Sequence, residues 1–297
     1  MNLPFLLYKS GLLLLAASIS SQVPTPAPPA DTEKPPATAS APTPQVSPKT
    51  MAWQLLRSGV RSRKADQRAT AVKVLSLLPG RRAAIEMAKN ALDDENPKVR
   101  VAAATSLGEL KARSAIPKLK AALSDKEISV VLAAAHALLQ LKDPSAYEVY
   151  YAILTGQRKS GNGLIAGQLE TIKDPKKLAM LGIQEGIGFV PFAGIGYTAI
   201  KTILKDDTSP VRAAAARVLA GDRDRDTLDE LASTAVNDKS ELVRTAALEA
   251  VARHDDPAYI SKIAPAMEDD KDPVRYTAAA AVARLSAVAD RRGAEKK

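Results

Sequence analysis

Few residues of this chain could carry out acid–base, nucleophilic or metal chemistry. The sequence has two histidines, His136 and His254, and no cysteine. Thiolate nucleophiles, thiolate metal sites, disulfides and a lipid anchor on an N-terminal cysteine are therefore excluded. A serine hydrolase would depend on one of those histidines, and no Gly-x-Ser-x-Gly sequence is present. The sequence predicts no catalytic residue, no metal ligand, no cofactor and no small-molecule substrate, so we expect that the protein is not an enzyme.

The sequence lacks the patterns of loops that bind phosphate or calcium. The glycines from Gly182 to Gly196 do not match a Gly-x-Gly-x-x-Gly pattern after a strand, and no Walker sequence occurs. The acidic runs Asp222–Asp226 and Asp269–Asp272 are interrupted by cations. We interpret these runs as helix caps and solvated turns rather than as calcium sites.

An internal repeat accounts for most of the chain. One phrase, clearest in Asn96–Ala104, recurs with an arginine or its substitute at the same place in every copy. These places are Arg68, Arg100, Val131, Arg212, Arg244 and Arg275. They are separated by 32, 31, 81, 32 and 31 residues, so one repeat near the middle is enlarged by about 19 residues.

Each copy of the phrase predicts the beginning of a helix. An Asn or Asp caps a helix and a following proline suits its first turn, as at Asn96 and Pro97. Apolar residues then recur at helical spacing, and a second helical segment such as 115–123 precedes the next copy. Neither helix can bury its apolar stripe alone. We therefore expect stacked helical hairpins that share one core.

The repeated phrase resembles HEAT-like repeats of the short bacterial kind, which occur in phycocyanobilin-lyase-like proteins. The resemblance covers roughly Ala65–Ala289 and implies an all-α fold, a right-handed α-solenoid of about six to seven helical hairpins. It also implies that the repeated arginine is structural and ties neighbouring turns together. These structural arginines are Arg68, Arg100, Arg212, Arg244 and Arg275.

Some HEAT-like proteins are enzymes, and the resemblance brings two activities to consider. In deoxyhypusine hydroxylase, His-Glu pairs hold two iron ions, but here Ala137 follows His136 and Asp255 follows His254. That iron site is therefore not expected, and His136 is interpreted as a partly buried packing residue. A lyase acting on a bilin remains the enzyme alternative, although export of the chain would place it badly for that chemistry.

The N-terminal residues predict export. Residues 1–20 combine Lys9 with the short apolar run Leu12–Ala17 and small residues at Ser18 and Ser20, as in a cleavable signal peptide. An uncleaved membrane anchor is the alternative. Residues 21–50 are rich in proline and predict a disordered linker. The expected location is therefore periplasmic or secreted.

The remaining residues divide into a repeat domain and a tail. We expect the HEAT-like domain to span 51–290, with the enlarged repeat at 143–206 and a charged tail at 291–297. Residues 51–92 hold nine basic and two acidic side chains, so one end of the domain is basic. This end is interpreted either as a solvated cap or as a surface for anionic partners. The predicted partner-binding residues there are Arg61, Arg63, Lys64, Arg81 and Arg82.

The enlarged repeat contains an apolar segment. Residues 186–200 carry no charge, and Phe189 and Phe192 flank Pro191. We expect an apolar hairpin, which either packs on the solenoid, binds a partner or inserts shallowly into a membrane. As a partner-binding loop it would use Ile187, Phe189, Phe192 and Ile195, with the two phenylalanines supplying most of the affinity.

These patterns favour a non-catalytic scaffold of the cell envelope that binds one or more proteins. The expected surfaces are the concave face of the solenoid, the basic N-terminal end and the apolar hairpin, with contact to an anionic membrane surface also considered. Nucleic acid is not expected as a partner. A nucleic-acid-binding module becomes the alternative if the chain is not exported, because clustered Lys and Arg suffice for backbone contacts.

Overall fold

A computed structural model of the 297-residue chain describes residues 46–155 and 208–295. Over these ranges every regular element is helical, which confirms the predicted all-α class. The predicted export signal, most of the linker and the apolar segment 186–200 lie outside the described residues. No described helix has the length and apolar character needed to cross a bilayer.

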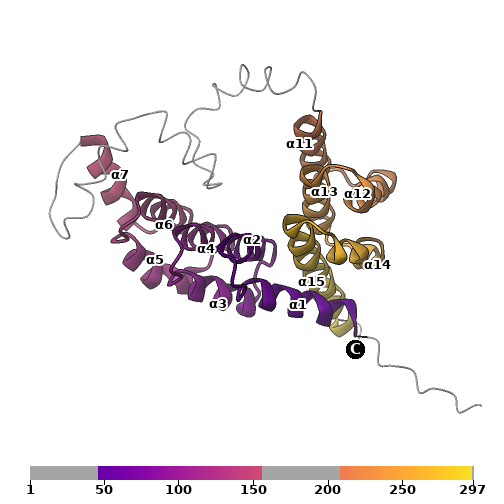
Figure 1. Cartoon of the computed structure of the whole chain (residues 1–297), viewed down its shortest axis with the longest axis horizontal. Helices are drawn as coiled ribbons and strands as arrows, with labels where there is room; N and C mark the ends of the chain where they lie inside the picture. The colour runs from indigo at the N-terminus through magenta and orange to yellow at the C-terminus, as the bar shows by residue number, and fades with distance from the viewer. Residues whose placement is uncertain (1–45, 156–207, 296–297) are drawn as a thin grey trace, which may run out of the picture. The chain divides into compact units, whose positions relative to one another are not determined.

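The first described stretch forms helices that pair and stack. Helices α2, α4 and α6, each the second helix of a pair, pack on one another in that order. Helices α3 and α5 pack against α4 and α6 (Figure 1). The α-helices are α1 (Pro48–Gly59), α2 (Ala65–Lys73), α3 (Arg82–Ala91), α4 (Pro97–Glu109), α5 (Ile116–Ala122), α6 (Ile128–Gln140) and α7 (Ser145–Thr155). Short 3-10 turns η1 (Val74–Leu77) and η2 (Arg113–Ala115) lie between them.

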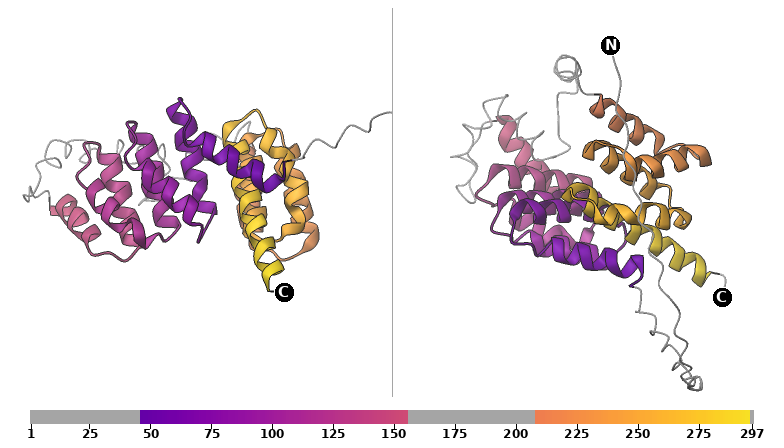
Figure 2. Two further views of the ribbon diagram at one scale, coloured as in Figure 1. Left: turned by 90° about the horizontal axis from the view of Figure 1, so that it is seen from below. Right: turned by 45° about the vertical axis from the view of Figure 1, so that its right-hand side comes forward.

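The second described stretch repeats this arrangement. Helices α11, α13 and α15 stack in that order, while α12 and η4 pack against α13 and α15 (Figure 2). The elements are α11 (Ser209–Leu219), α12 (Arg225–Asn237), α13 (Glu241–Arg253), η3 (Pro257–Tyr259), α14 (Ile260–Ile263), η4 (Ala264–Glu268) and α15 (Asp272–Ala294). The stacked hairpins make the fold an all-α solenoid.

Small aliphatic side chains fill the core between the stacked helices. Leu107, Leu138 and Leu248 are fully buried among alanines of the neighbouring helices. At Gly108 an added Cβ would lie 2.9 Å from the Cα of Ala137, so α4 and α6 approach closely there. Burial of each leucine contributes roughly 2 kcal/mol, and the alanines permit the close approach.

The repeated phrase opens the second helix of each hairpin. Pro97, Pro210 and Pro273 all lie in first turns, and Asn96 Oδ1 accepts a hydrogen bond from the Lys98 N–H at 3.0 Å. The cap is not the same in every copy, because Thr208 and Lys271 occupy that position without a side-chain bond. The helical region begins earlier than residue 51, since Ser47 caps α1 at Pro48, and α15 continues to Ala294.

In two hairpins the second helix is followed by a lysine with a left-handed backbone conformation. Lys111 has φ 51° and Lys142 has φ 60°, although neither is glycine. After each, a backbone N–H reaches back to a carbonyl in the last turn: Ala112 to Leu107 at 3.0 Å, and Asp143 to Leu138 at 2.9 Å. This is the Schellman arrangement, which satisfies carbonyls that the helix leaves open.

The first and last hairpins also pack against each other. Helix α15 contacts α1, α2 and η1, so residues more than 200 positions apart meet. A Cβ at Gly59 would lie 2.6 Å from Tyr276 and 2.7 Å from Ala71, so only glycine fits. Arg284 Nη1 donates to the carbonyl of Leu77 at 3.2 Å. The two described stretches therefore share one continuous core through this junction.

Candidate protein-binding groove

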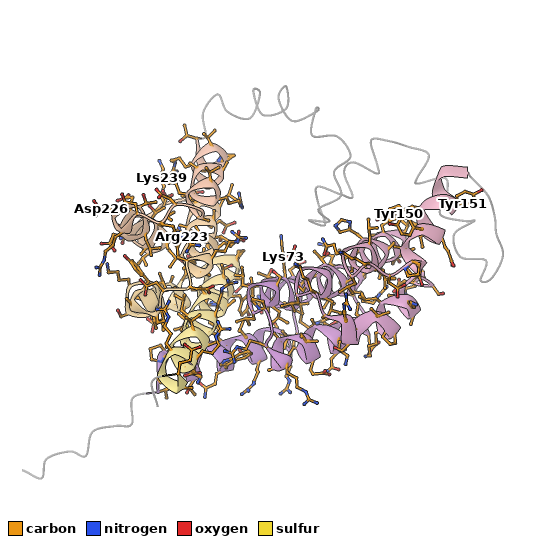
Figure 3. The ribbon with its side chains drawn as sticks, turned by 180° about the vertical axis from the view of Figure 1, so that it is seen from behind. Lys73, Tyr150, Tyr151, Arg223, Asp226 and Lys239 are labelled. Atoms are coloured by element: carbon orange, nitrogen blue, oxygen red, sulfur yellow. The ribbon has the colours of Figure 1, made fainter. Side chains whose placement is uncertain are left out.

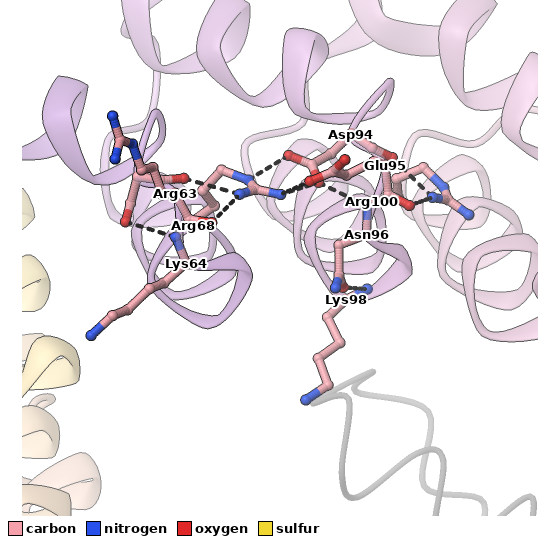
Figure 4. Close-up of polar contacts among 9 residues, drawn as sticks. Arg63, Lys64, Arg68, Asp94, Glu95, Asn96, Lys98 and Arg100 are labelled. Carbon is pink, nitrogen blue, oxygen red and sulfur yellow. Dashed lines mark hydrogen bonds and ion pairs between the residues drawn. The ribbon is translucent and has the colours of Figure 1, made fainter.

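The repeated arginine binds an aspartate of the next repeat. Arg68 donates to both carboxylate oxygens of Asp94, from Nε and Nη2 at 2.8 Å each (Figure 4). Arg100 binds Asp125 in the same way, at 2.7 and 2.8 Å. All four side chains are largely buried. Paired hydrogen bonds of this kind fix both distance and orientation between the two groups.

The same arginine also donates a hydrogen bond to the turn that precedes its own helix. Arg68 Nη1 donates to the carbonyl of Ser62 at 2.9 Å, and Arg100 Nη1 donates to the carbonyl of Asp94 at 2.9 Å. In each case the acceptor lies six residues before the arginine. Each guanidinium therefore joins the turn before its own helix to the corresponding turn of the next repeat.

The second stretch keeps most of this arrangement. Arg244 Nη1 donates to the carbonyl of Asp238 at 2.7 Å, and its Nη2 donates to Asp269 at 3.0 Å. Arg212 binds Asp238, which again lies in the next repeat. Arg275 differs, because it binds Asp272 of its own helix.

The aspartates have a second donor, which affects their ionisation. Oδ1 of Asp94 accepts from the Asn96 N–H at 2.9 Å, and Oδ1 of Asp125 accepts from the Glu127 N–H at 2.9 Å. Burial by itself raises the pKa of both carboxyl groups. The hydrogen bonds from the arginine and from the backbone outweigh burial, so each pKa lies below its ordinary value. Both aspartates are therefore charged at neutral pH.

The two histidines lie on different helical hairpins. His136 lies half-buried on α6, and its Nε2 is 3.0 Å from Nε2 of Gln140. Burial lowers the pKa of His136 more than the nearby Glu109 carboxylate raises it, so the ring is neutral at pH 7. His254 follows α13. Within 46–155 and 208–295, no three His, Asp or Glu side chains are grouped as metal ligands would be.

A groove of about 520 Å³ lies where the second helices of the first and last hairpins meet. We call it the junction groove. Residues of α2, η1, α4, α13 and α15 line it, among them the apolar Ala69, Ala102 and Val74. Its other lining residues are Asp66, Thr70, Lys73, Ser76, Leu77, Lys98, Glu109, Thr245, Glu249, Arg253, Pro273 and Thr277.

The lining of the junction groove carries both signs of charge. It includes three acidic residues, Asp66, Glu109 and Glu249, and three basic ones, Lys73, Lys98 and Arg253. Lys98 Nζ is 3.3 Å from Asp66, and Arg253 is 3.9 Å from Glu249. Neither Lys73 nor Glu109 forms an ion pair with another described residue. Lys73 projects from the end of α2 (Figure 3).

Comparison with protein families assigns the repeat. The family described as HEAT repeats matches residues 85–158 and 198–283, which together exceed half of the chain. The chain belongs to the HEAT-repeat family. The resemblance inferred from the repeated phrase is thereby confirmed.

Two solved structures of HEAT-like proteins are similar to this chain. One is human deoxyhypusine hydroxylase in complex with glycerol, 17% identical, with 81% of this chain and 97% of that chain covered and a TM-score of 0.32. The other is the complex of CpcE and CpcF of phycocyanin lyase from Nostoc sp., 20% identical, with 87% and 98% covered and a TM-score of 0.33. Comparison with curated protein sequences gave no significant match.

The HEAT-repeat structure separates the basic residues predicted to bind a partner. Arg61, Arg63 and Lys64 are exposed in the turn between α1 and α2. Arg82 begins α3, and Arg81 precedes it and lines a separate cavity with residues of α15. Ile187, Phe189, Phe192 and Ile195 lie outside the described residues. Within the described ranges, none of the five predicted basic residues lines the junction groove.

Two features of the HEAT repeats were missed from sequence. The aspartate that receives each arginine lies six residues before the next anchor position: Asp94, Asp125, Asp238 and Asp269. This spacing was available in the sequence and marks the partner of the arginine. The junction groove had no comparable signal, because α2 and α15 are brought together only by the packing of the first hairpin on the last.

Proposed function

We propose that this HEAT-repeat chain is a non-catalytic scaffold of the cell envelope and that it binds a protein partner in the junction groove. The observation that carries the proposal is the lining of this groove, which combines apolar side chains with three acidic and three basic ones. A polypeptide offers apolar side chains and both signs of charge, and therefore complements such a surface.

The balance of charge argues against nucleic acid as the ligand of this groove. Binding to a phosphate backbone requires clustered Lys and Arg, because affinity comes from neutralising phosphates. Asp66, Glu109 and Glu249 line the groove and would repel those phosphates. A peptide instead pairs its basic side chains with Glu109 and its acidic ones with Lys73.

The envelope location rests on the N-terminal sequence. Lys9, the apolar run Leu12–Ala17 and the small residues after it have the order of an export signal. The proline-rich residues 21–50 would then hold the HEAT repeats away from the membrane surface. Sequencing the N-terminus of the mature protein tests this part. A chain starting near Ser21 in the periplasm supports it, whereas an intact Met1 in the cytoplasm contradicts it and favours the nucleic-acid alternative.

Site-specific photocrosslinking in the native host tests the groove. A benzophenone amino acid at position 73 should give a discrete covalent adduct with one protein. The same amino acid at position 239, on the exposed turn after α12, is the control (Figure 3). Adducts that are identical at the two positions, or absent from position 73, would count against the groove as the binding surface.

A further inference from the structure

A second cavity, of about 220 Å³, brings together three arginines from opposite ends of the described chain. It lies where the turn before α3 meets α15. We call it the arginine pocket, and its lining consists of Leu78, Pro79, Arg81, Asp255, Arg284, Ala287 and Arg291. It shares no residue with the junction groove.

Helix α15 supplies one wall of the arginine pocket. Arg284, Ala287 and Arg291 follow one another at helical intervals of three and four residues, so their side chains share one face. Ala287 is buried and small, which leaves room between the two arginines. This spacing presents two guanidinium groups to one cavity.

A turn with fixed geometry supplies the opposite wall. Pro79 and Gly80 occupy the centre of a turn closed by the Arg81 N–H, which donates to the carbonyl of Leu78 at 3.2 Å. Gly80 has φ +72°, and a glycine after a proline is typical of a type II turn. The backbone of Arg81 is therefore held in place beside the cavity.

The three arginines are not equivalent. Arg284 donates to both oxygens of Asp255, at 2.8 and 3.2 Å, so its charge is already matched. Arg81 and Arg291 form no ion pair with any residue in the described ranges. With three positive groups and one negative group around it, the arginine pocket has a net charge of +2 before any ligand binds.

We propose that the arginine pocket binds a phosphate group. A phosphate monoester carries close to two negative charges at neutral pH, which equals the excess charge of the lining. Guanidinium groups donate paired hydrogen bonds that match the spacing of phosphate oxygens. A carboxylate would neutralise only half of the excess. The pocket lies at the contact between the first and last hairpins, so the bound group would join residues of both.

Titration calorimetry of the full-length chain with inorganic phosphate tests the proposal. Saturable binding is expected, and the double variant Arg81→Gln, Arg291→Gln should weaken it by at least about tenfold. The control is Arg223→Gln, Lys239→Gln, which removes the same charge from exposed positions of the second stretch and should leave the affinity unchanged. Circular dichroism should give the same helical content for all three proteins, since Arg81 and Arg291 form no ion pair with a residue that the structure describes.

The source of the phosphate is distinguished by a second ligand. Phosphatidylcholine vesicles containing phosphatidic acid present the same phosphate monoester on a membrane. If these vesicles bind in a way that requires Arg81 and Arg291, while inorganic phosphate does not bind, the ligand is a lipid headgroup and the pocket assignment holds. Failure of both ligands to bind, or equal loss in the pocket and control variants, would overturn the proposal.

Discussion

Arg100 and Asp125 join two neighbouring repeats through parallel hydrogen bonds of 2.7 and 2.8 Å. The two residues lie 25 positions apart, and the same relationship links Arg244 with Asp269. The second donor of Asp125 is the Glu127 N–H, which closes the turn before α6. The pair therefore connects the position of one helix to the turn that begins the next.

Removing one residue of the buried Arg100–Asp125 pair should destabilise the fold, because the charge of the other residue stays buried. Replacing Arg100 by methionine keeps much of its apolar stem and leaves the Asp125 carboxylate without its guanidinium. We expect the free energy of unfolding to fall by roughly 3 kcal/mol, measured by urea denaturation. The matched control is Lys98→Met, whose exposed pair with Asp66 should contribute less than about 1 kcal/mol. Equal effects of the two substitutions would contradict a structural role for Arg100.

The aspartates of these pairs should make stability depend on acid pH. The pKa of Asp94 and that of Asp125 are lowered in the folded chain, so each carboxylate stabilises the fold fully above its unfolded pKa of about 3.9. This contribution is lost as pH falls through the lower, folded-state pKa. Unfolding measured from neutral pH down to about pH 3 should therefore depend less steeply on pH in the variant Asp94→Asn, Asp125→Asn than in the natural chain. An unchanged pH dependence would contradict this assignment.

Replacing a lysine that has a left-handed backbone conformation by glycine should stabilise the fold. Lys111 has φ 51°, a conformation that costs a side chain about 1 kcal/mol and costs glycine almost nothing. We expect Lys111→Gly to raise the free energy of unfolding by about 0.5–1 kcal/mol. Ala121→Gly, at an exposed position inside α5, is the control and should lower it by a similar amount. A loss of stability in both variants would contradict the Schellman turn.

The contact between the first and last hairpins should not tolerate a methyl group. Gly59→Ala would place its Cβ 2.6 Å from the ring of Tyr276, which requires the helices to separate. We expect a loss of about 1–3 kcal/mol in stability. Gly221→Ala is the control, because its Cβ would meet only the Val218 carbonyl at 3.7 Å. If both variants are equally stable, α1 and α15 do not pack as described.

The helix starts could be predicted from sequence because their causes are local. Pro97 and Pro273 fix the first turn of α4 and α15, and the alanines that follow favour a helix. The recurring arginine then indicates which positions of the successive repeats correspond to one another. Local signals do not identify what a helix packs against once it has formed.

The parts that sequence did not predict depend on contacts between distant residues. Tyr276 closes over Gly59, and Arg284 reaches the carbonyl of Leu77, across more than 200 positions. Both candidate sites, the junction groove and the arginine pocket, arise at this contact. Arg81 was expected to be part of a basic surface, but its proximity to Arg291 follows only from the packing of α15.

The central claim, that a protein partner occupies the junction groove, is tested most directly by affinity. The partner crosslinked at position 73 would be purified, and its dissociation constant measured for the natural chain and for Lys73→Glu. Reversing this charge in the groove lining should weaken binding by about tenfold or more, whereas Lys239→Glu should leave it unchanged. Unchanged affinity in Lys73→Glu, or equal loss in both variants, would contradict the assignment of this groove.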